Sequence, residues 1–392
     1  MDELEVVNVN FGDCFICRTA GDQMLIDFGS TRKLADSVCN FVNTKLNYHN
    51  NYLMITHFHS DHYSGIKHLD SKIQFSEVYL PNFFSKSIIR LEFALLALLR
   101  ASSESYLIAY NLISVIPDLY LHLQYNSRIC FVKRGDYIQN TVDKFRVLWP
   151  DCTNIDDKAD KLYKQLMDYY KVTEKSDKEN IILSMTDEYM NLLEPLFSAE
   201  QKEILIDRDN LSNLSELRRI IHDFAENNNN FKDFKPKKRL SSKLGRSISS
   251  FQNNISLCCD NYTDDKSSQD IKLILFLSDI NTSSYEKIAA TKEKKFELAD
   301  LYYAIKVPHH GTKDYFINNL PQSSYLIISN GKAMMSWRIT ALYGVNYCDR
   351  CFICTNYLGA CDYELTGKRC TAYLNLSQKS KCGINISYLL KT

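Results

Sequence analysis

The alternation of apolar and polar residues predicts that the first third of the chain consists of β-strands separated by helices. Residues two apart on an extended segment face the same side, so a strand with one buried face alternates in this way. The expected strands are LEVVNVN (4–10), CFICRT (14–19), QMLID (23–27), YLMIT (52–56) and EVYLP (77–81). Between the third and fourth strands, apolar residues from Leu34 to Val42 at helical spacing predict a helix, with Ser30 or Thr31 as its N-cap.

Helical spacing dominates the middle of the chain. Residues 85–124 are apolar and predict two packed helices, whereas residues 151–250 predict charged helices in segments such as LSELRRIIHDF. The strands expected on either side are ICFVK (129–133), KFRVLWP (144–150), ISLCC (255–259), IKLILFLSD (271–279), YYAIKVP (302–308) and YLIISNG (325–331). The pattern therefore predicts one α/β domain over residues 1–392, interrupted by a helical insertion at 151–250.

Composition and charge narrow the class of protein. The 392 residues carry 47 Lys plus Arg and 47 Asp plus Glu, so net charge does not indicate a polyanionic partner. The 13 cysteines are odd in number and scattered, which is typical of reduced thiols in a cytoplasmic protein. The start, MDELEVVNVN, does not resemble a signal peptide, and the apolar stretch FALLALL (93–99) is far shorter than the roughly 20 residues of a membrane span. We therefore expect a cytoplasmic protein without a membrane partner.

The segment THFHSDHYSG (56–65) concentrates metal-binding side chains directly behind a predicted strand. On an extended segment His57 and His59 face one point. If a helix begins after Ser60, Asp61 and His62 lie in its first turn and face a second point. Because imidazole and carboxylate are typical zinc ligands, the segment predicts two neighbouring divalent ions. The alternative is a polar surface turn that contains histidines without binding a metal.

Two further predicted strands end on residues of the same type. IKLILFLSD ends on Asp279, and IKVPHHG continues into His309 and His310. Sites in α/β proteins usually lie at the carboxyl ends of strands. Alone, Asp279 is more typical of a turn or a helix cap, and an adjacent histidine pair is a weak signal. Three metal-type clusters, each at a strand end, together indicate one site.

These motifs resemble those of the metallo-β-lactamase fold hydrolases, and most closely the subgroup typified by the hydrolase domain of ComEC-type DNA-uptake proteins. The resemblance covers roughly residues 4–80, 129–150 and 250–355. It rests, in chain order, on NVNFGDCFICRTAGDQMLIDFGS, THFHSDHYSG, QNNISL, LFLSD and VPHHGT.

The resemblance implies an αββα sandwich that carries two divalent metal ions. One ion would be held by His57 and His59, the other by Asp61 and His62, and Asp279 would bridge them. One histidine of the 309–310 pair would complete the second site. Because neighbours on an extended strand point to opposite sides, only one of the two is expected to bind the metal, and His309 is taken as that ligand. His310 would then touch substrate or donate a proton, and Asp61 would serve catalysis as well as metal binding.

Other positions match the family in part. Asp27 in LIDFG matches a buried aspartate that orients the metal site through hydrogen bonds, and Asp13 in FGDC is expected beside it; a purely structural role for either is an open alternative. No histidine occurs between 223 and 308, and Gln252 and Asn253 stand where many members of the wider fold have a further ligand. The first ion would then keep an open or water-filled position. After SNG (329–331), the segment KAMMSWRIT lacks the His-Pro that the subgroup often has.

The expected activity is hydrolysis. Two neighbouring ions lower the pKa of a shared water from 15.7 to about 7, so that a metal-bound hydroxide attacks the substrate. Zinc is the expected metal, with manganese or iron as alternatives at the second site. The resemblance favours a phosphoester substrate, a phosphodiester in a nucleotide or nucleic acid. The alternatives are a lactone or thioester hydrolase, and a metal-containing binding or sensing module with little activity. Helices in 151–250 and 85–124 are expected to form a cap that restricts which substrates reach the metals.

Two other features allow more than one interpretation. KPKKRLSSKLGR (235–246) fits a segment that follows a phosphate backbone, although a solvated tether is the more usual role of such a stretch. Regularly spaced cysteines near the end of the chain are compatible with a further zinc site, although YCDRCFICTN (347–356) more simply predicts a strand with buried thiols. These cysteines are Cys348, Cys351, Cys354, Cys361, Cys370 and Cys382.

Overall fold

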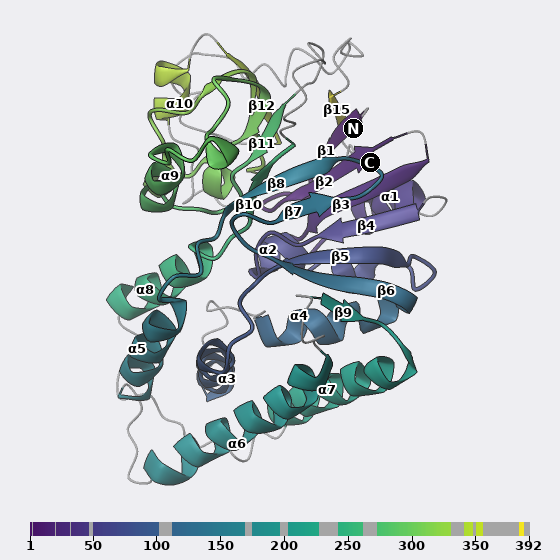
Figure 1. The fold of residues 1–392 in the computed structure, drawn as a ribbon, viewed down its shortest axis with the longest axis vertical. Coiled ribbons are helices and arrows are strands. Elements are labelled where there is room, and N and C mark those ends of the chain that lie inside the picture. The colour runs from purple at the N-terminus through teal and green to yellow at the C-terminus, as the bar shows by residue number, and fades with distance from the viewer. Residues whose placement is uncertain are drawn as a thin grey trace.

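The protein is a mixed α/β structure with two mixed β-sheets (Figure 1). The computed structural model describes residues 1, 3–19, 21–31, 33–46, 50–101, 112–168, 175–196, 203–226, 242–261, 273–330, 341–347, 350–355 and 384–387. Gly331, the segment KAMMSWRIT, residues 235–241 of the basic stretch, and Cys348, Cys361, Cys370 and Cys382 lie outside the described residues. The α/β class predicted from the sequence is confirmed.

The first sheet has eight strands, and its central part is parallel. Strands β3, β4, β5 and β6 run parallel to one another, and the hairpin of β1 and β2 pairs antiparallel to β3. In spatial order the strands are β15 (Ile384–Ser387), β1 (Glu3–Val7), β2 (Cys14–Arg18), β3 (Asp22–Phe28), β4 (Asn50–Met54), β5 (Phe75–Pro81), β6 (Leu123–Val132) and β9 (Glu203–Leu205).

The second sheet has seven strands, and β11 to β14 form its parallel half. In spatial order the strands are β14 (Cys351–Cys354), β13 (Gln322–Ile328), β12 (Leu301–Lys306), β11 (Ile274–Phe276), β10 (Cys258–Asp260), β8 (Lys144–Trp149) and β7 (Tyr137–Gln139). All the strands expected from alternation are present. The sequence pattern did not predict the short strands β7, β9 and β15, and β14 confirms the strand expected around Cys351.

Helices flank the sheets. They are α1 (Asp36–Leu46), α2 (Ser60–Tyr63), α3 (Lys86–Ala101), α4 (Leu112–Leu119), α5 (Ile155–Met167), α6 (Lys175–Leu193), α7 (Arg208–Glu226), α8 (Ser242–Asn253), α9 (Thr282–Ala289) and α10 (Ala341–Asn346). The N-cap expected at Ser30 or Thr31 is wrong, because α1 begins only at Asp36 and the Thr31 N–H instead donates to the Phe11 carbonyl at 3.0 Å. No helix within the described ranges is both long enough and apolar enough to cross a membrane.

Three apolar clusters hold the layers together. One lies between the sheets, where Phe15 of β2 meets Phe276 of β11 edge to face with ring centroids 5.6 Å apart. A second covers the other face of the first sheet with α1 and the helices α3 to α8. A third covers the other face of the second sheet and includes Tyr285 of α9 and Tyr343 of α10. Each sheet is therefore buried on both faces, which is typical of strands with continuous apolar runs.

The predicted insertion is mostly helical but also extends the first sheet. Helices α5 to α8 lie within residues 151–253, and in Figure 1 they pack beside α3 and α4 below the first sheet. Strand β9, which was not expected there, pairs antiparallel with β6. Apolar residues of α6 and α7, such as Ile182 and Leu214, share one cluster with Leu25 and Phe75 of the sheet. These helices therefore continue the core of the sheet. Their role in restricting access stays a prediction.

A buried ion pair fixes the second sheet to the loop before β12. Arg146 on β8 and Asp260 on β10 are 1 % and 0 % exposed, and the guanidinium holds the carboxylate through two hydrogen bonds of 2.7 and 3.1 Å. Arg146 also donates to the carbonyls of Lys295 and Glu297, and the Tyr302 hydroxyl donates to Asp260 at 2.7 Å. This network satisfies both charges without water.

Replacing Asp260 by alanine should destabilise the fold, because it removes the carboxylate that neutralises the buried Arg146 guanidinium. Losing one partner of such a pair costs about 3–5 kcal/mol of the free energy of unfolding, which urea denaturation measures. The control is Asp223→Ala on α7, which removes an exposed partner of Arg219 and should change that free energy by less than about 1 kcal/mol. Equal, small losses in both variants would contradict the importance of the buried pair.

Candidate metal centre

The three sequence clusters meet where strands of both sheets end. Asp27 lies near the end of β3, His57 to His62 follow β4, Asp279 follows β11, and His309 and His310 follow β12. The parallel pairing of β3 with β4 and of β11 with β12 places these ends side by side. Helix α2 begins at Ser60, as predicted, with Asp61 and His62 in its first turn. Figure 1 shows α2 near the centre of the molecule.

Two glycines allow the turn after β1 and the end of β3 to approach α2. A Cβ atom on Gly12 would lie 2.2 Å from the Gly29 carbonyl oxygen, and one on Gly29 would lie 2.4 Å from the His62 nitrogen. With no side chains there, the Asp13 N–H donates to the Asp61 carbonyl at 2.9 Å. The glycines in FGDC and DFGS therefore bring the Asp13 and Asp27 carboxylates to the histidine segment.

The backbone of the centre is strained. Asp27, Ser278, His309 and His310 have φ values of 54°, 42°, 44° and 57°. These values lie in the left-handed region of backbone conformation, which is uncommon for residues other than glycine. The remaining non-glycine residues with positive φ in the described ranges are all asparagine. Each such conformation costs on the order of 1–3 kcal/mol and persists only where surrounding contacts impose it. Strain concentrated at one place is typical of a functional site.

Asp279 is the common neighbour of three histidines. Its Oδ2 atom lies 3.3 Å from His62 Nε2, 3.7 Å from His309 Nε2 and 3.9 Å from His310 Nε2. His310 Nε2 is also 3.1 Å from Asp61 Oδ2. The ligand atoms of Asp61, His62, Asp279 and His310 all lie within 4.8 Å of one another, and all four residues are buried. This group can hold a metal ion.

His57 and His59 lie beside this group without belonging to it, and the His57 ring centroid is 4.9 Å from that of His62. Their ring centroids are 4.1 Å apart and the rings meet edge to face. His57 Nδ1 is 2.8 Å from the Ser256 hydroxyl, and its buried Nε2 atom has no hydrogen-bond partner. His59 Nε2 is 2.9 Å from Gln252 Oε1, and the Gln252 amide donates to Glu92 Oε1 at 3.0 Å. These contacts orient the rings and leave His57 Nε2 able to coordinate an ion.

The conformation of the histidine pair differs from the expectation. His309 and His310 do not alternate as on a strand, because both adopt left-handed backbone angles in a turn after β12. Both Nε2 atoms consequently approach Asp279. His310 belongs to the four-residue ligand group, whereas His309 stacks on Tyr315 with centroids 3.9 Å apart and bonds to Thr312 through Nδ1 at 2.7 Å. The expected extended conformation, from which only one of the two histidines was predicted to bind the metal, is therefore wrong.

Asp27 and Asp13 lie behind the ligand atoms. Asp27 Oδ2 is 2.9 Å from His62 Nδ1, and its Oδ1 accepts from the Thr56 N–H at 2.7 Å. Asp13 Oδ1 is 3.3 Å from His310 Nδ1. Each carboxylate thus contacts the ring nitrogen that points away from Asp279 and fixes the orientation of that ring. Asp27 also belongs, with Asp13 and His62, to a second buried group of metal-type atoms.

A buried lysine that sequence analysis missed lies among these carboxylates. Lys306, 1 % exposed at the end of β12, places its ammonium 2.6 Å from Asp13 Oδ2 and 3.7 Å from Asp279 Oδ1. Burial alone would lower its pKa, but the charges of Asp13 and Asp279 outweigh burial and raise it. Its only sequence signal was a cation inside the apolar strand before the histidine pair. Ser256 and Glu92, far away in sequence, gave no signal.

Charged and proton-binding groups balance one another in the pocket. Burial would raise the pKa values of Asp13, Asp61 and Asp279, but the facing histidines, and for Asp13 also Lys306, lower them, so all three carboxylates stay ionised. Three carboxylates face the single ammonium of Lys306. Although burial opposes it, these carboxylates with Asp27 raise the pKa of His62 well above its usual value and that of His310 to about 9. The protons held by His62 and His310, together with Lys306, balance the three carboxylates, and a divalent ion would take the place of those protons.

Two further histidines of the centre, His57 and His309, are neutral. Burial lowers the pKa of His57 well below its usual value and the pKa of His309 to about 4. Neutral imidazole is the form that binds a metal ion or accepts a proton. The centre thus contains neutral nitrogen donors beside a buried group of carboxylates.

Comparison with known proteins does not assign a function to this site. No protein-family model matches the chain, and no curated protein matches it. The function is therefore argued from the arrangement of these side chains.

Proposed function

We propose that the chain is a metal-dependent hydrolase with the αββα sandwich of the metallo-β-lactamase fold, similar to the hydrolase domain of ComEC-type proteins. The support is architectural and chemical. Two facing sheets are covered by apolar clusters on their other faces. The segments that carry the resemblance bring their histidines and aspartates together at the strand ends.

The ligand atoms fit a dinuclear centre. His57 and His59 would hold one ion, Asp61, His62 and His310 the other, and Asp279 would be shared. The observation that carries this proposal is that His57 Nε2 is buried without a hydrogen-bond partner, and that His62 Nε2 and both Asp279 oxygens are buried with charged neighbours at 3.3 to 3.9 Å but no hydrogen bond. Buried polar atoms are almost always satisfied, and ions bound between these atoms would satisfy them. Nitrogen and carboxylate donors favour zinc, with manganese or iron as alternatives.

Bound divalent ions would act as Lewis acids and lower the pKa of water. The protein's own residues orient the ligands and exclude solvent: Ser256 and Gln252 hold the first histidine pair, and Lys306 holds Asp13 beside Asp279. His309, neutral and stacked on Tyr315, takes the role expected of His310, namely contact with substrate or transfer of a proton at Nε2. The proposed substrate class is a phosphodiester, as the family resemblance favours.

The activity is tested by turnover of a bis-aryl phosphodiester with added zinc or manganese. Wild-type protein should hydrolyse this substrate. The His59→Ala protein should be at least about 100-fold slower, because the substitution removes a ligand of the first ion. Losses of this order follow when one group that stabilises a transition state is deleted. The matched control is His222→Ala, an exposed histidine on α7, which should retain wild-type activity. Metal-loaded wild type no faster than His59→Ala would favour a binding module over an enzyme.

Replacing Asp279 by asparagine tests the shared ligand. Because Asp279 approaches three histidines, Asp279→Asn should lower the metal content of both sites and abolish turnover. Elemental analysis after dialysis measures the first effect. Asp314→Asn, which alters an exposed carboxylate in the following turn, should keep metal and activity. An Asp279→Asn protein that is folded and retains its full metal content would show that Asp279 is only a structural cap.

A further inference from the structure

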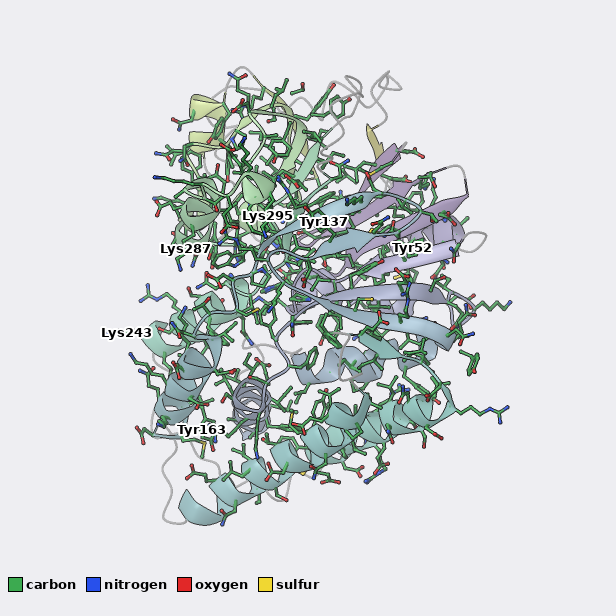
Figure 2. All side chains as sticks on the ribbon, in the orientation of Figure 1. Tyr52, Tyr137, Tyr163, Lys243, Lys287 and Lys295 are labelled. Atoms are coloured by element: carbon green, nitrogen blue, oxygen red, sulfur yellow. The ribbon has the colours of Figure 1, made fainter. Side chains whose placement is uncertain are left out.

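A basic groove lies between two helices of the insertion. It has a volume of about 550 Å³ and runs between α5 and α8. Two lysines of α5, Lys158 and Lys161, line one side, and Lys243 and Arg246 of α8 line the other. No aspartate or glutamate is among the residues lining it. Figure 2 shows Lys243 at the outer side of α8, away from the sheets.

Helical spacing produces this groove. Residues three, four and seven apart share one face of a helix. Lys158, Lys161 and Gln165 follow this spacing on α5, as do Lys243, Arg246, Ser247 and Ser250 on α8. The two matching faces lie against one another, because α5 and α8 pack together. The groove thus combines four cations with hydroxyl and amide groups, all of which bind phosphate oxygens.

The charges on α5 are segregated between two faces. Two of its three acidic residues lie on the side of α3, where Asp160 pairs with Arg90 at 2.8 Å and Asp156 accepts from Ser85, which precedes that helix. The lysines lie on the groove side, and Lys158, Lys161 and Lys243 are exposed and form no ion pair with any residue in the described part of the chain. Like charges brought together without counterions are repulsive, so a ligand that neutralises them gains affinity.

We propose that the groove between α5 and α8 binds the sugar-phosphate backbone of a single-stranded nucleic acid. Its volume falls in the range of pockets for small molecules, roughly 300–1,000 Å³, so it would hold one or two nucleotides of a strand and not a duplex. A membrane surface fits less well. An interfacial helix inserts large apolar side chains, and none of the exposed large apolar residues in the described ranges lies on α5 or α8.

Helix α8 connects the groove to the metal centre. Its other end carries Gln252, which contacts His59, and Asn253, which donates to the Tyr315 hydroxyl at 2.6 Å beside His309. At a rise of 1.5 Å per residue, Lys243 and Gln252 are about 14 Å apart along the helix axis. This step rests on the proposed hydrolase function. The substrate would then be a nucleic-acid strand bound in the groove, rather than a free nucleotide.

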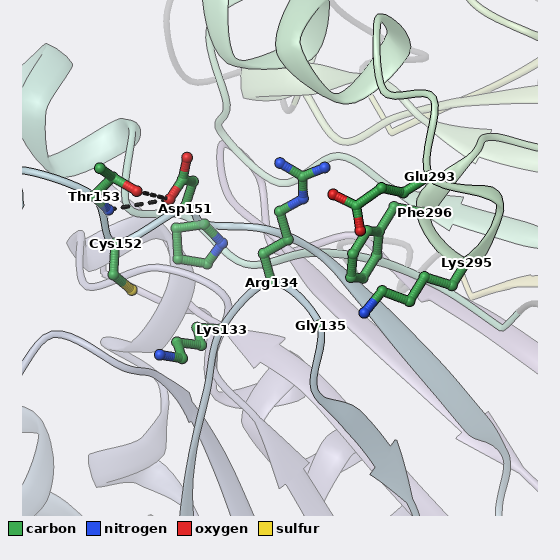
Figure 3. Close-up of a pocket in the computed structure, with 10 residues that line it drawn as sticks. Lys133, Arg134, Gly135, Asp151, Cys152, Thr153, Glu293, Lys295 and Phe296 are labelled. Atoms are coloured by element: carbon green, nitrogen blue, oxygen red, sulfur yellow. Dashed lines mark hydrogen bonds between the residues drawn. The ribbon is translucent and has the colours of Figure 1, made fainter.

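A second hollow of about 520 Å³ is less suited to this role. It is lined by Lys133, Arg134 and Lys295 but also by Asp151 and Glu293. Figure 3 shows the Arg134 side chain between Asp151 on one side and Glu293 and Phe296 on the other. The Arg134 guanidinium donates to Thr291 at 2.7 Å and lies 4.9 Å from the centre of the Phe296 ring. Its cations are therefore partly balanced or already engaged.

The test is binding of a fluorescent 20-nucleotide phosphorothioate strand, which resists hydrolysis, over a range of salt concentrations. The groove variant Lys158→Gln/Lys243→Gln removes one cation from each helix. Each phosphate contact with a single strand contributes about 0.7 to the slope of log affinity against log salt. The variant should therefore reduce the slope by about 1.4 and weaken binding at low salt about tenfold.

The matched control is Lys72→Gln/Lys144→Gln, which removes the same charge from two exposed lysines outside the groove and should bind as wild type does. Equal losses in both variants would overturn the proposal, since only net charge would then matter. Tighter binding of wild type to the duplex, or to vesicles of anionic lipid, would also overturn it. Because the strand is not cleaved, failure of the hydrolase proposal would appear separately, as an inactive protein that still binds.

Discussion

The structure depends on keeping several carboxylates ionised in a buried pocket. Asp13, Asp61 and Asp279 meet where strands of both sheets end, and each has a lowered pKa because cationic or proton-binding groups face it. Lys306 balances part of this charge. The remaining negative charge is balanced by protons or divalent cations, which the histidine nitrogens around Asp279 can bind. The glycine pair, the left-handed turns and the buried hydrogen bonds all serve to bring these groups together.

Local patterns in the sequence predicted much of this arrangement. The strands followed from alternation, and the histidine segment followed from its spacing behind β4. The convergence of Asp279 with the histidine pair followed from the rule that sites lie at the carboxyl ends of strands. These predictions succeeded because each depends on a few neighbouring residues and on the parallel order of β11 and β12.

Features that depend on tertiary contacts were not predictable. The left-handed angles of His309 and His310 are imposed by packing, so a pattern typical of an extended strand gave the wrong orientation. In the sequence Lys306 is one cation within an apolar strand, and its partners Asp13 and Asp279 are far from it along the chain, so its role could not be predicted. The groove combines helices from opposite ends of the insertion, and only part of one of them, the basic stretch before residue 247, was singled out from the sequence. Strand β9 has only 3 residues, too few to show an alternation of apolar and polar residues in the sequence.

The insertion is connected to the centre through α8, whose Gln252 and Asn253 contact residues on both sides of it. In the proposed function, α8 would couple binding of a strand on its cationic face to hydrolysis, because the end of the same helix contacts His59. The most direct test of the dinuclear centre is anomalous X-ray diffraction at the absorption edge of the metal found in the purified protein. The account predicts two anomalous peaks on either side of Asp279, one beside His57 and His59 and one beside Asp61, His62 and His310. The absence of any peak there after reconstitution with zinc or manganese would contradict it.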